Sequence, residues 1–287
     1  MVATPDDGAA AGFSSGLSVA EFAACLAMGL EPVGLVQGFC AMQIGNYAMG
    51  LTQMGQPVGG QGGYVENYQC PHGMVGGEHR MWGQNYEQTW MEQAWSGGFT
   101  AALDRMRDEA TRLGAHGVVG VLDTETSLAG AGVIEFHVRG TAVRVMSTSS
   151  PSAPWTTYLA GQRLVKLFES GFVPVSVVAA VASVRVYAYC ITEYLMGGGG
   201  LTMWSPSSSS VEIEQLVRAQ SLSRDIVRSL ARSQLHGDDL HAARLDVVDR
   251  EHERGDLEVW STLRGNRVRR FRAIEALPTP QPTVRLT

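Results

Sequence analysis

The sequence predicts an α+β fold made of two tandem copies of one β-α-β-β domain, each preceded by a short helix. Three observations lead to this prediction. An apolar strand entered through proline occurs twice, a long amphipathic helix follows each of these strands, and a closing strand that contains Arg-Gly follows each helix.

Composition indicates a globular protein. The 287 residues are 45% hydrophobic and 17% charged, which is poor in charge for a soluble monomer, so we expect buried subunit contacts. A net charge of −6 and a pI near 5.7 argue against a nucleic-acid partner. The arginines near the C-terminus, from Arg264 to Arg272, are then expected on a solvated or subunit-facing edge.

No membrane span or secretion signal is expected. Residues 1–16 lack a basic n-region and an apolar h-region, and the valine-rich segment 172–190 is interrupted by Pro174 and Arg185. The chain contains four cysteines without C-x-x-C spacing: Cys25, Cys40, Cys70 and Cys190. We therefore expect a soluble cytoplasmic protein with reduced thiols.

The two copies begin alike. Ser18 and Glu21 form a capping-box pattern before a short helix that Gly29 ends, and Pro32 enters the first strand. A helical stretch over residues 158–170 likewise precedes a strand that contains Pro174, an offset of 174 − 32 = 142 residues.

The two copies also end alike. Apolar residues recur at helical spacing from Trp95 to Leu113 and from Ile213 to Leu230. The closing strands contain Arg139 and Arg264, an offset of 264 − 139 = 125 residues. The first copy therefore holds a longer connection between its strands, which a surface loop accommodates at low cost.

These matches give the domain organisation. The predicted parts are a domain at residues 18–146 with a Gly- and aromatic-rich insertion at 45–98, a Ser/Pro-rich linker at 147–154, a diverged domain at 155–272, and flexible tails at 1–17 and 273–287. Six aromatic residues of the insertion are expected to pack it against a neighbour: Tyr64, Tyr68, Trp82, Tyr86, Trp90 and Trp95.

A family resemblance rests on two segments. The first long helix runs into Leu113-Gly114-Ala115-His116-Gly117-Val118-Val119-Gly120-Val121, and Gly140-Thr141-Ala142-Val143 closes the copy. Over residues 30–146 the chain resembles the YbjQ family of heavy-metal-binding domains, whereas the second copy matches only in outline. The resemblance implies YbjQ-like or dodecin-subunit-like domains that form a homopentamer or a multiple of five chains.

The candidate metal ligands lie in the insertion. Cys70, His72 and His79 carry donors suited to a transition metal ion such as zinc or copper. Their spacing matches no strong zinc pattern and offers no fourth ligand, so the alternative that they only belong to a loop stays open. His116, in the signature turn, is expected to serve the turn rather than a metal.

Two acidic groups follow the predicted strands. Asp123 and Glu125 in the first copy, and Asp246, Asp249 and Glu251 in the second, could act as paired acid/base carboxylates or be a solvated turn. The glycine runs lack the context of a phosphate-binding loop, and no nucleophile elbow or His-Glu-x-x-His is present. The sequence therefore predicts no catalytic residue and no organic cofactor.

Taken together, these patterns favour a non-enzymatic, ring-forming oligomeric binding or assembly protein. Its insertion could bind a further protein partner. Two alternatives remain: a metal-binding or metal-homeostasis protein that uses Cys70, His72 and His79, and an enzyme with pockets between subunits lined by the acidic groups.

Overall fold

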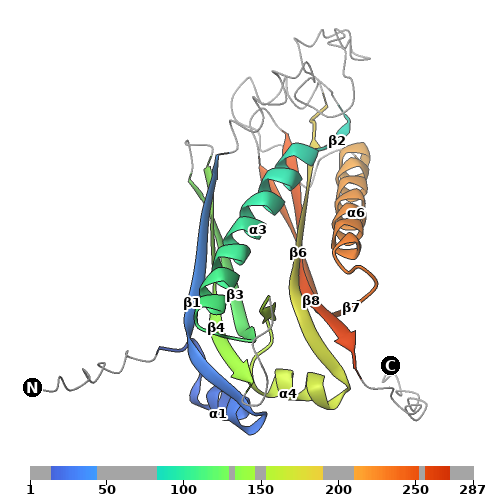
Figure 1. Cartoon of the computed structure of the whole chain (residues 1–287). Coiled ribbons are helices and arrows are strands. Elements are labelled where there is room, and N and C mark those ends of the chain that lie inside the picture. Colours follow the sequence, from blue (N-terminus) through green and yellow to red (C-terminus); the bar gives the residue numbers. More distant parts are fainter. Residues whose placement is uncertain are drawn as a thin grey trace, which may run out of the picture.

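A computed structural model of the chain describes residues 14–43, 83–128, 133–145, 153–189, 210–251 and 256–271. Within these ranges the chain forms four helices and two four-stranded sheets, an α+β fold (Figure 1). The elements are α1 (Val19–Ala27), β1 (Leu30–Gln43), β2 (Asn85–Glu87), α3 (Thr89–Arg112), β3 (Gly117–Leu128), β4 (Val133–Val145), β5 (Trp155–Thr156), α4 (Gly161–Glu169), β6 (Phe172–Val186), α6 (Ser210–Ser233), β7 (Asp239–Glu251) and β8 (Leu257–Arg270).

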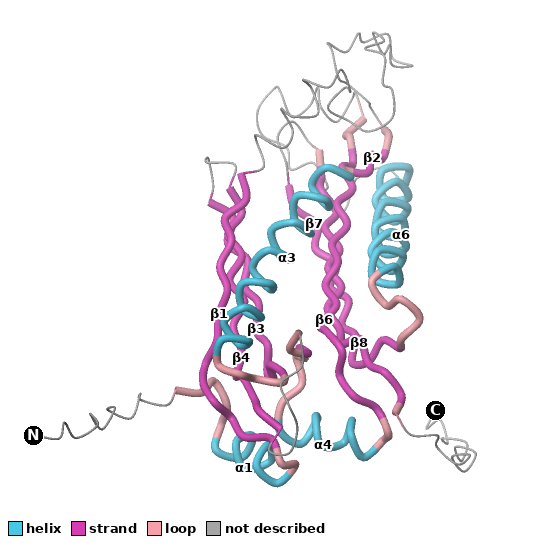
Figure 2. The backbone as a smooth tube through the Cα atoms, viewed as in Figure 1, coloured by secondary structure: helices cyan, strands magenta, loops and turns pink. Residues whose placement is uncertain are grey.

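Sheets and long helices alternate in layers. The first sheet has the strand order β1-β4-β3-β5 and the second has β2-β6-β8-β7. Helix α3 runs between the two sheets, and α6 covers the far face of the second sheet (Figures 1 and 2). The second sheet therefore has a helix on each face, whereas no described helix covers the outer face of the first sheet.

Helix α3 is buried because both of its sides meet apolar strands. Trp95 stacks on Phe99 with ring centroids 5.2 Å apart and meets Phe136 of the first sheet edge-on at 5.6 Å. The same cluster includes Val181 and Trp260 of the second sheet. The sequence prediction that the insertion extends to residue 98 is therefore wrong for its last ten residues, 89–98, which belong to α3 and pack inside their own chain.

A glycine permits the close contact between α3 and β1. A side chain at Gly38 would overlap the backbone of Ala102 and come within 2.7 Å of the nitrogen of Met106. Only a residue without Cβ fits at this crossing. At the end of α3, Gly114 takes the left-handed conformation with φ 65° that stops the helix.

The two halves of the chain, residues 14–145 and 153–271, share one pattern of strand pairing. Pro32 pairs with Val143, and Pro174 pairs with Val268, with offsets of 174 − 32 = 142 and 268 − 143 = 125. These are the offsets that the sequence gives for the two halves. Both strand pairs also have a bulge immediately after the proline.

A second bulge recurs in the other strand pair of each half. β3 is irregular between Val119 and Leu122, and β7 is irregular between His241 and Arg244, with an offset of 241 − 119 = 122. Each bulge holds one residue with positive φ, Gly120 at 60° and Ala242 at 50°, also at an offset of 242 − 120 = 122.

The long helices correspond as well. Both contain 24 residues, and they begin at Thr89 and Ser210, an offset of 210 − 89 = 121. The pair formed by Asp104 and Arg107, at 3.3 Å, recurs 121 residues later as a pair at 3.5 Å formed by two residues of α6: Asp225 and Arg228.

The segments that lead into α1 and α4 repeat the same contacts. Leu17 donates to Ser15 Oγ at 3.1 Å, and Leu159 donates to Thr157 Oγ1 at 3.1 Å. Residues 14–17 are therefore ordered, and the prediction of a tail up to residue 17 is wrong for this part. The capping box of Ser18 and Glu21 is confirmed, but the second short helix begins only at Gly161.

Short strands cross between the halves. β5 pairs in parallel with β3 of the first half, and β2 pairs with β6 of the second half. Residues 155–159 are extended rather than helical because their backbone groups bind the edge of β3. Among the described residues, no helix has the length and apolar character needed to cross a membrane.

Candidate functional site

The junction between the two halves holds a group of ionised and aromatic side chains. Arg264 Nε donates to Asp123 Oδ2 at 2.6 Å, and its Nη2 lies 3.9 Å from Glu125 Oε2. Glu125 also accepts a hydrogen bond from Trp95 Nε1 at 2.6 Å. Burial and then the charge of Asp123 raise the pKa of Tyr158 well above its usual value. The first two acids of the sequence analysis therefore connect the halves rather than forming a solvated turn.

A second polar group joins α3 to the second sheet. The backbone nitrogen of Ser183 donates to Glu92 Oε1 at 3.2 Å, and Ser183 Oγ lies 2.6 Å from Gln88 Oε1 and 2.8 Å from Glu258 Oε1. Burial, helped by the negative charge of Glu87, raises the pKa of Glu92 to about 7, while the hydrogen bond from Ser183 opposes this shift. The N-terminal part of α3 is thus fixed to β6 by hydrogen bonds.

The third part of the junction is a strand contact. Thr157 donates its N–H to the carbonyl of Val118 at 3.0 Å, and its own carbonyl accepts from Val121 at 3.0 Å. Its hydroxyl donates to Asn266 Oδ1 at 2.8 Å, the same oxygen that accepts from the backbone of Tyr158 at 2.8 Å. Residues 155–159 therefore bind both sheets at once.

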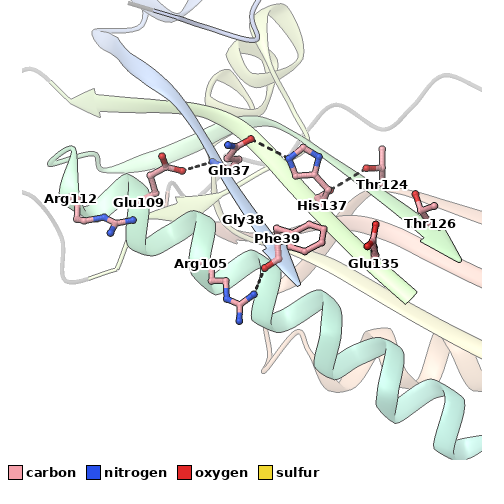
Figure 3. Close-up of a pocket in the computed structure, with 10 residues that line it drawn as sticks. All are labelled: Gln37, Gly38, Phe39, Arg105, Glu109, Arg112, Thr124, Thr126, Glu135 and His137. Carbon is pink, nitrogen blue, oxygen red and sulfur yellow. Dashed lines mark hydrogen bonds between the residues drawn. The ribbon is translucent and has the colours of Figure 1, made fainter. Parts of the chain in front are cut away.

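The outer face of the first sheet carries a hollow of about 720 Å³ (Figure 3). Side chains of α3 reach around β1 at its rim: Glu109 accepts from the backbone nitrogen of Gln37 at 2.7 Å, and Arg105 donates to the carbonyl of Phe39. The His137 ring lies 3.3 Å from Gln37 Oε1. These contacts occupy backbone groups that an edge strand would otherwise expose.

The predicted metal ligands Cys70, His72 and His79 lie outside the described residues. His116 is buried in the turn after α3, where its Nδ1 accepts from the backbone nitrogen of Val145 at 3.1 Å. In the part of the chain that the structure describes, no three His, Cys, Asp or Glu side chains are arranged to hold a metal ion.

The acids of the second half lie apart from the junction. Asp246 pairs with Arg244 at 2.8 Å, Asp249 accepts from Gln220 at 2.9 Å, and Glu251 is exposed at the end of β7. The structure thus brings Asp123 and Glu125 to one place and does not bring the second acidic group to them.

Sequence reasoning missed the partners of these acids. It placed Arg264 on an edge, whereas this side chain is about two-thirds covered in the junction. Alternation in β8 offered a signal, because Arg264 and Asn266 are polar positions on one face of a strand whose residues are mostly buried. Glu92 and Ser183 gave no such signal, since each lies among small or apolar neighbours whose partners are distant in sequence.

Two comparisons with known proteins bear on this arrangement. Over 174 residues the chain is 31% identical to an encapsulin nanocompartment protein of Mycobacterium tuberculosis, a match that covers 58% of this chain and 54% of that protein. The chain thus spans about half the length of the curated relative that it matches. Residues 65–146 match the YbjQ family model described as "Putative heavy-metal-binding". The resemblance to the YbjQ family is therefore confirmed for the segment that forms α3, β3 and β4.

Proposed function

We propose that this protein is a non-enzymatic, ring-forming assembly protein whose chain contains two copies of one domain, at residues 18–146 and 155–272. The observation that carries this proposal is the place of α3 between two sheets (Figure 1). Within one chain, the helix of the first copy covers the sheet of the second. The shared registers, bulges and helix ion pair support duplication of the domain.

Two faces have no cover among the described residues once the copies have packed. The outer face of the first sheet exposes 49% of Phe39, and the outer face of α6 exposes 50% of Ile213 and 56% of Val217. Large exposed apolar side chains that gather on one face are typical of protein contact surfaces. Units that repeat one contact by rotation close into a ring when the rotations sum to a full turn.

The comparisons agree with assembly. The relative is named an encapsulin nanocompartment protein. The family resemblance implies rings built on a multiple of five chains. We propose a cytoplasmic location. We also propose that the part of the insertion before α3, residues 45–88, contacts a further protein partner.

Light scattering and native mass spectrometry of the full chain test this function. We expect a discrete particle whose mass is a multiple of five chains at micromolar concentration. A monomer under the same conditions would contradict the proposal, because the exposed faces of α6 and the first sheet would then have no partner of the same sequence.

Metal binding is the second candidate, favoured by the family description over the segment that contains Cys70, His72 and His79. Elemental analysis of the purified chain should find stoichiometric zinc or copper, and Cys70→Ala should remove most of it. Cys190→Ala, which changes a thiol outside the matched segment, is the control and should retain the metal. Wild-type protein without stoichiometric metal would exclude this candidate.

A further inference from the structure

The edge of β3 is closed by a segment of the other copy. Gly120 donates to the carbonyl of Leu159 at 3.0 Å, and Val121 donates to the carbonyl of Thr157 at 3.0 Å. Both donors lie in the bulge of β3, where the positive φ of Gly120 turns two successive N–H groups outward. The bulge is thus the docking element for the segment that leads into the second copy.

The equivalent edge, on β7, has the same geometry and no partner among the described strands. β7 lies at the end of the second sheet, and its one partner among the described strands is β8. Ala242 corresponds to Gly120, at 242 − 120 = 122, and keeps a left-handed φ of 50° although it has a side chain. Such a conformation is unfavourable for a residue with a side chain and is often retained where it serves a contact.

The equivalent lead-in segment is also present. Residues 15–17 repeat the internal hydrogen bond of residues 157–159, and Gly16 donates to Thr141 Oγ1 at 3.1 Å as Tyr158 donates to Asn266. Residues 14–17 thus bind the first sheet as residues 157–159 bind the second. Residues 155–159 also pair with the edge of β3, whereas residues 14–17 pair with no described strand.

The helix faces correspond in the same way. Glu92 of α3 meets Ser183 of the second sheet at 3.2 Å, and the equivalent residues are Ile213 (92 + 121) and Ala41 (183 − 142). Both members of the polar pair therefore have apolar equivalents. Val217 of α6 and Phe39 of β1 are further exposed apolar residues of these two faces.

One polar contact of the junction keeps its chemistry. Arg107 Nη2 lies 3.4 Å from Thr156 Oγ1, and the equivalent residues are Arg228 (107 + 121) and Ser14 (156 − 142), again an arginine and a hydroxyl. Matching residues on two surfaces that do not touch within the chain point to contact between chains.

We propose that chains associate head to tail, so that α6 and the β7 edge of one chain receive the outer face of the first sheet and residues 14–17 of the next. This contact repeats, between chains, the one that α3 and β3 make with the second copy. The proposal rests on the proposed function, because it specifies the surface through which the ring forms. Its occupant is a second copy of this chain, since each surface matches the other.

Two single variants test the pairing. Val217→Glu and Phe39→Glu each add a carboxylate to one of the two proposed contact surfaces, and each should raise the dissociation constant at least roughly a hundredfold and yield monomers by light scattering. Both side chains are about half exposed, so neither change disturbs the core. Val248→Glu is the matched control, because Val248 is 51% exposed on β7 away from residues 240–243, and it should assemble normally.

Mixing the two variants distinguishes a head-to-tail contact from a two-fold one. Each variant retains one intact surface, so the mixture should form one-to-one dimers that do not grow further. If both variants assemble as the wild-type protein does, this inference is wrong, but the proposed function is not affected. Monomeric wild-type protein would remove both, and variants that are monomeric but never pair would overturn the head-to-tail arrangement.

A cysteine pair tests the strand register. Val118 is the strand partner of Thr156, so the equivalent partners are Leu240 (118 + 122) and Ser14 (156 − 142). Neighbouring strands bring paired Cα atoms to about 5 Å, within disulfide range. Ser14→Cys with Leu240→Cys should give an interchain disulfide, and Ser14→Cys with Val247→Cys should not. Equal cross-linking of both pairs would overturn the register.

Discussion

Glu92 makes stability depend on pH in an unusual direction. Its side chain is 7% exposed between α3 and β6, and burial together with Glu87 raises its pKa from 4.5 to about 7. Between these values the folded chain holds a proton that the unfolded chain releases. The free energy of unfolding therefore falls as pH rises through this window, and it levels off above pH 7.

The size of this effect follows from the difference between the two pKa values. The shift of 7 − 4.5 = 2.5, at 1.36 kcal/mol per unit, gives about 3 kcal/mol as an upper value. Glu92→Gln keeps an oxygen that can accept from the backbone of Ser183 but has no ionising group. We expect the variant to match wild type near pH 4.5 and to exceed its stability by up to about 3 kcal/mol at pH 8.

Guanidinium denaturation followed by tryptophan fluorescence, at a series of pH values and one protein concentration, measures this difference. Glu214→Gln is the control, because Glu214 is an exposed acid of α6 and undergoes the same chemical change. If the curves of wild type and Glu92→Gln stay parallel from pH 5 to pH 8, the buried carboxyl does not titrate as argued.

Three further substitutions test the packing of the two halves. Asp123→Asn should lower the free energy of unfolding by about 2 kcal/mol, because Arg264 then loses its carboxylate partner at 2.6 Å and keeps only Glu125 at 3.9 Å; denaturant melts should show this, and a loss below about 0.5 kcal/mol would contradict it. Asn266→Ala should leave two donors of the segment 155–159 without an acceptor and cost about 2 kcal/mol, with faster hydrogen exchange in that segment; unchanged exchange would contradict the contact. Gly38→Ala should cost about 2 kcal/mol or more because its Cβ meets the backbone of Ala102, and a neutral effect in thermal melts would show that α3 can move away freely.

The sequence specified much of the fold through local chemistry. Pro32 and Pro174 lack a donor and occur where each strand has its bulge, so the same register follows in both halves. Ser18 and Glu21 cap a helix by contacts three residues apart. Such signals are short in range, which is why they can be read without knowing the partner segments.

The order of the sheet and helix layers could not be predicted from such local signals. Periodicity gives α3 one apolar face, yet the helix also packs on β6 of the second sheet, which begins only at Phe172. β2 and β5 have three and two residues, too few to show alternation. Their positions depend on the free edges of β6 and β3, and the order of the layers decides which edges are free.

The contact between the halves of one chain is more polar than the proposed contact between chains. Residues 153–154 precede β5 on the same chain, so the contact inside the chain forms at high effective concentration and tolerates polar pairs such as Glu92 with Ser183. A contact between chains has no such help and must gain its free energy from apolar burial, which the equivalent Ile213 and Ala41 can supply. The same chemistry determines which helix packs on which sheet. If α3 packed on the first sheet of another chain, Gln88 would face Ala41 and lose the hydroxyl that Ser183 provides. We therefore expect α3 to stay on the second sheet of its own chain.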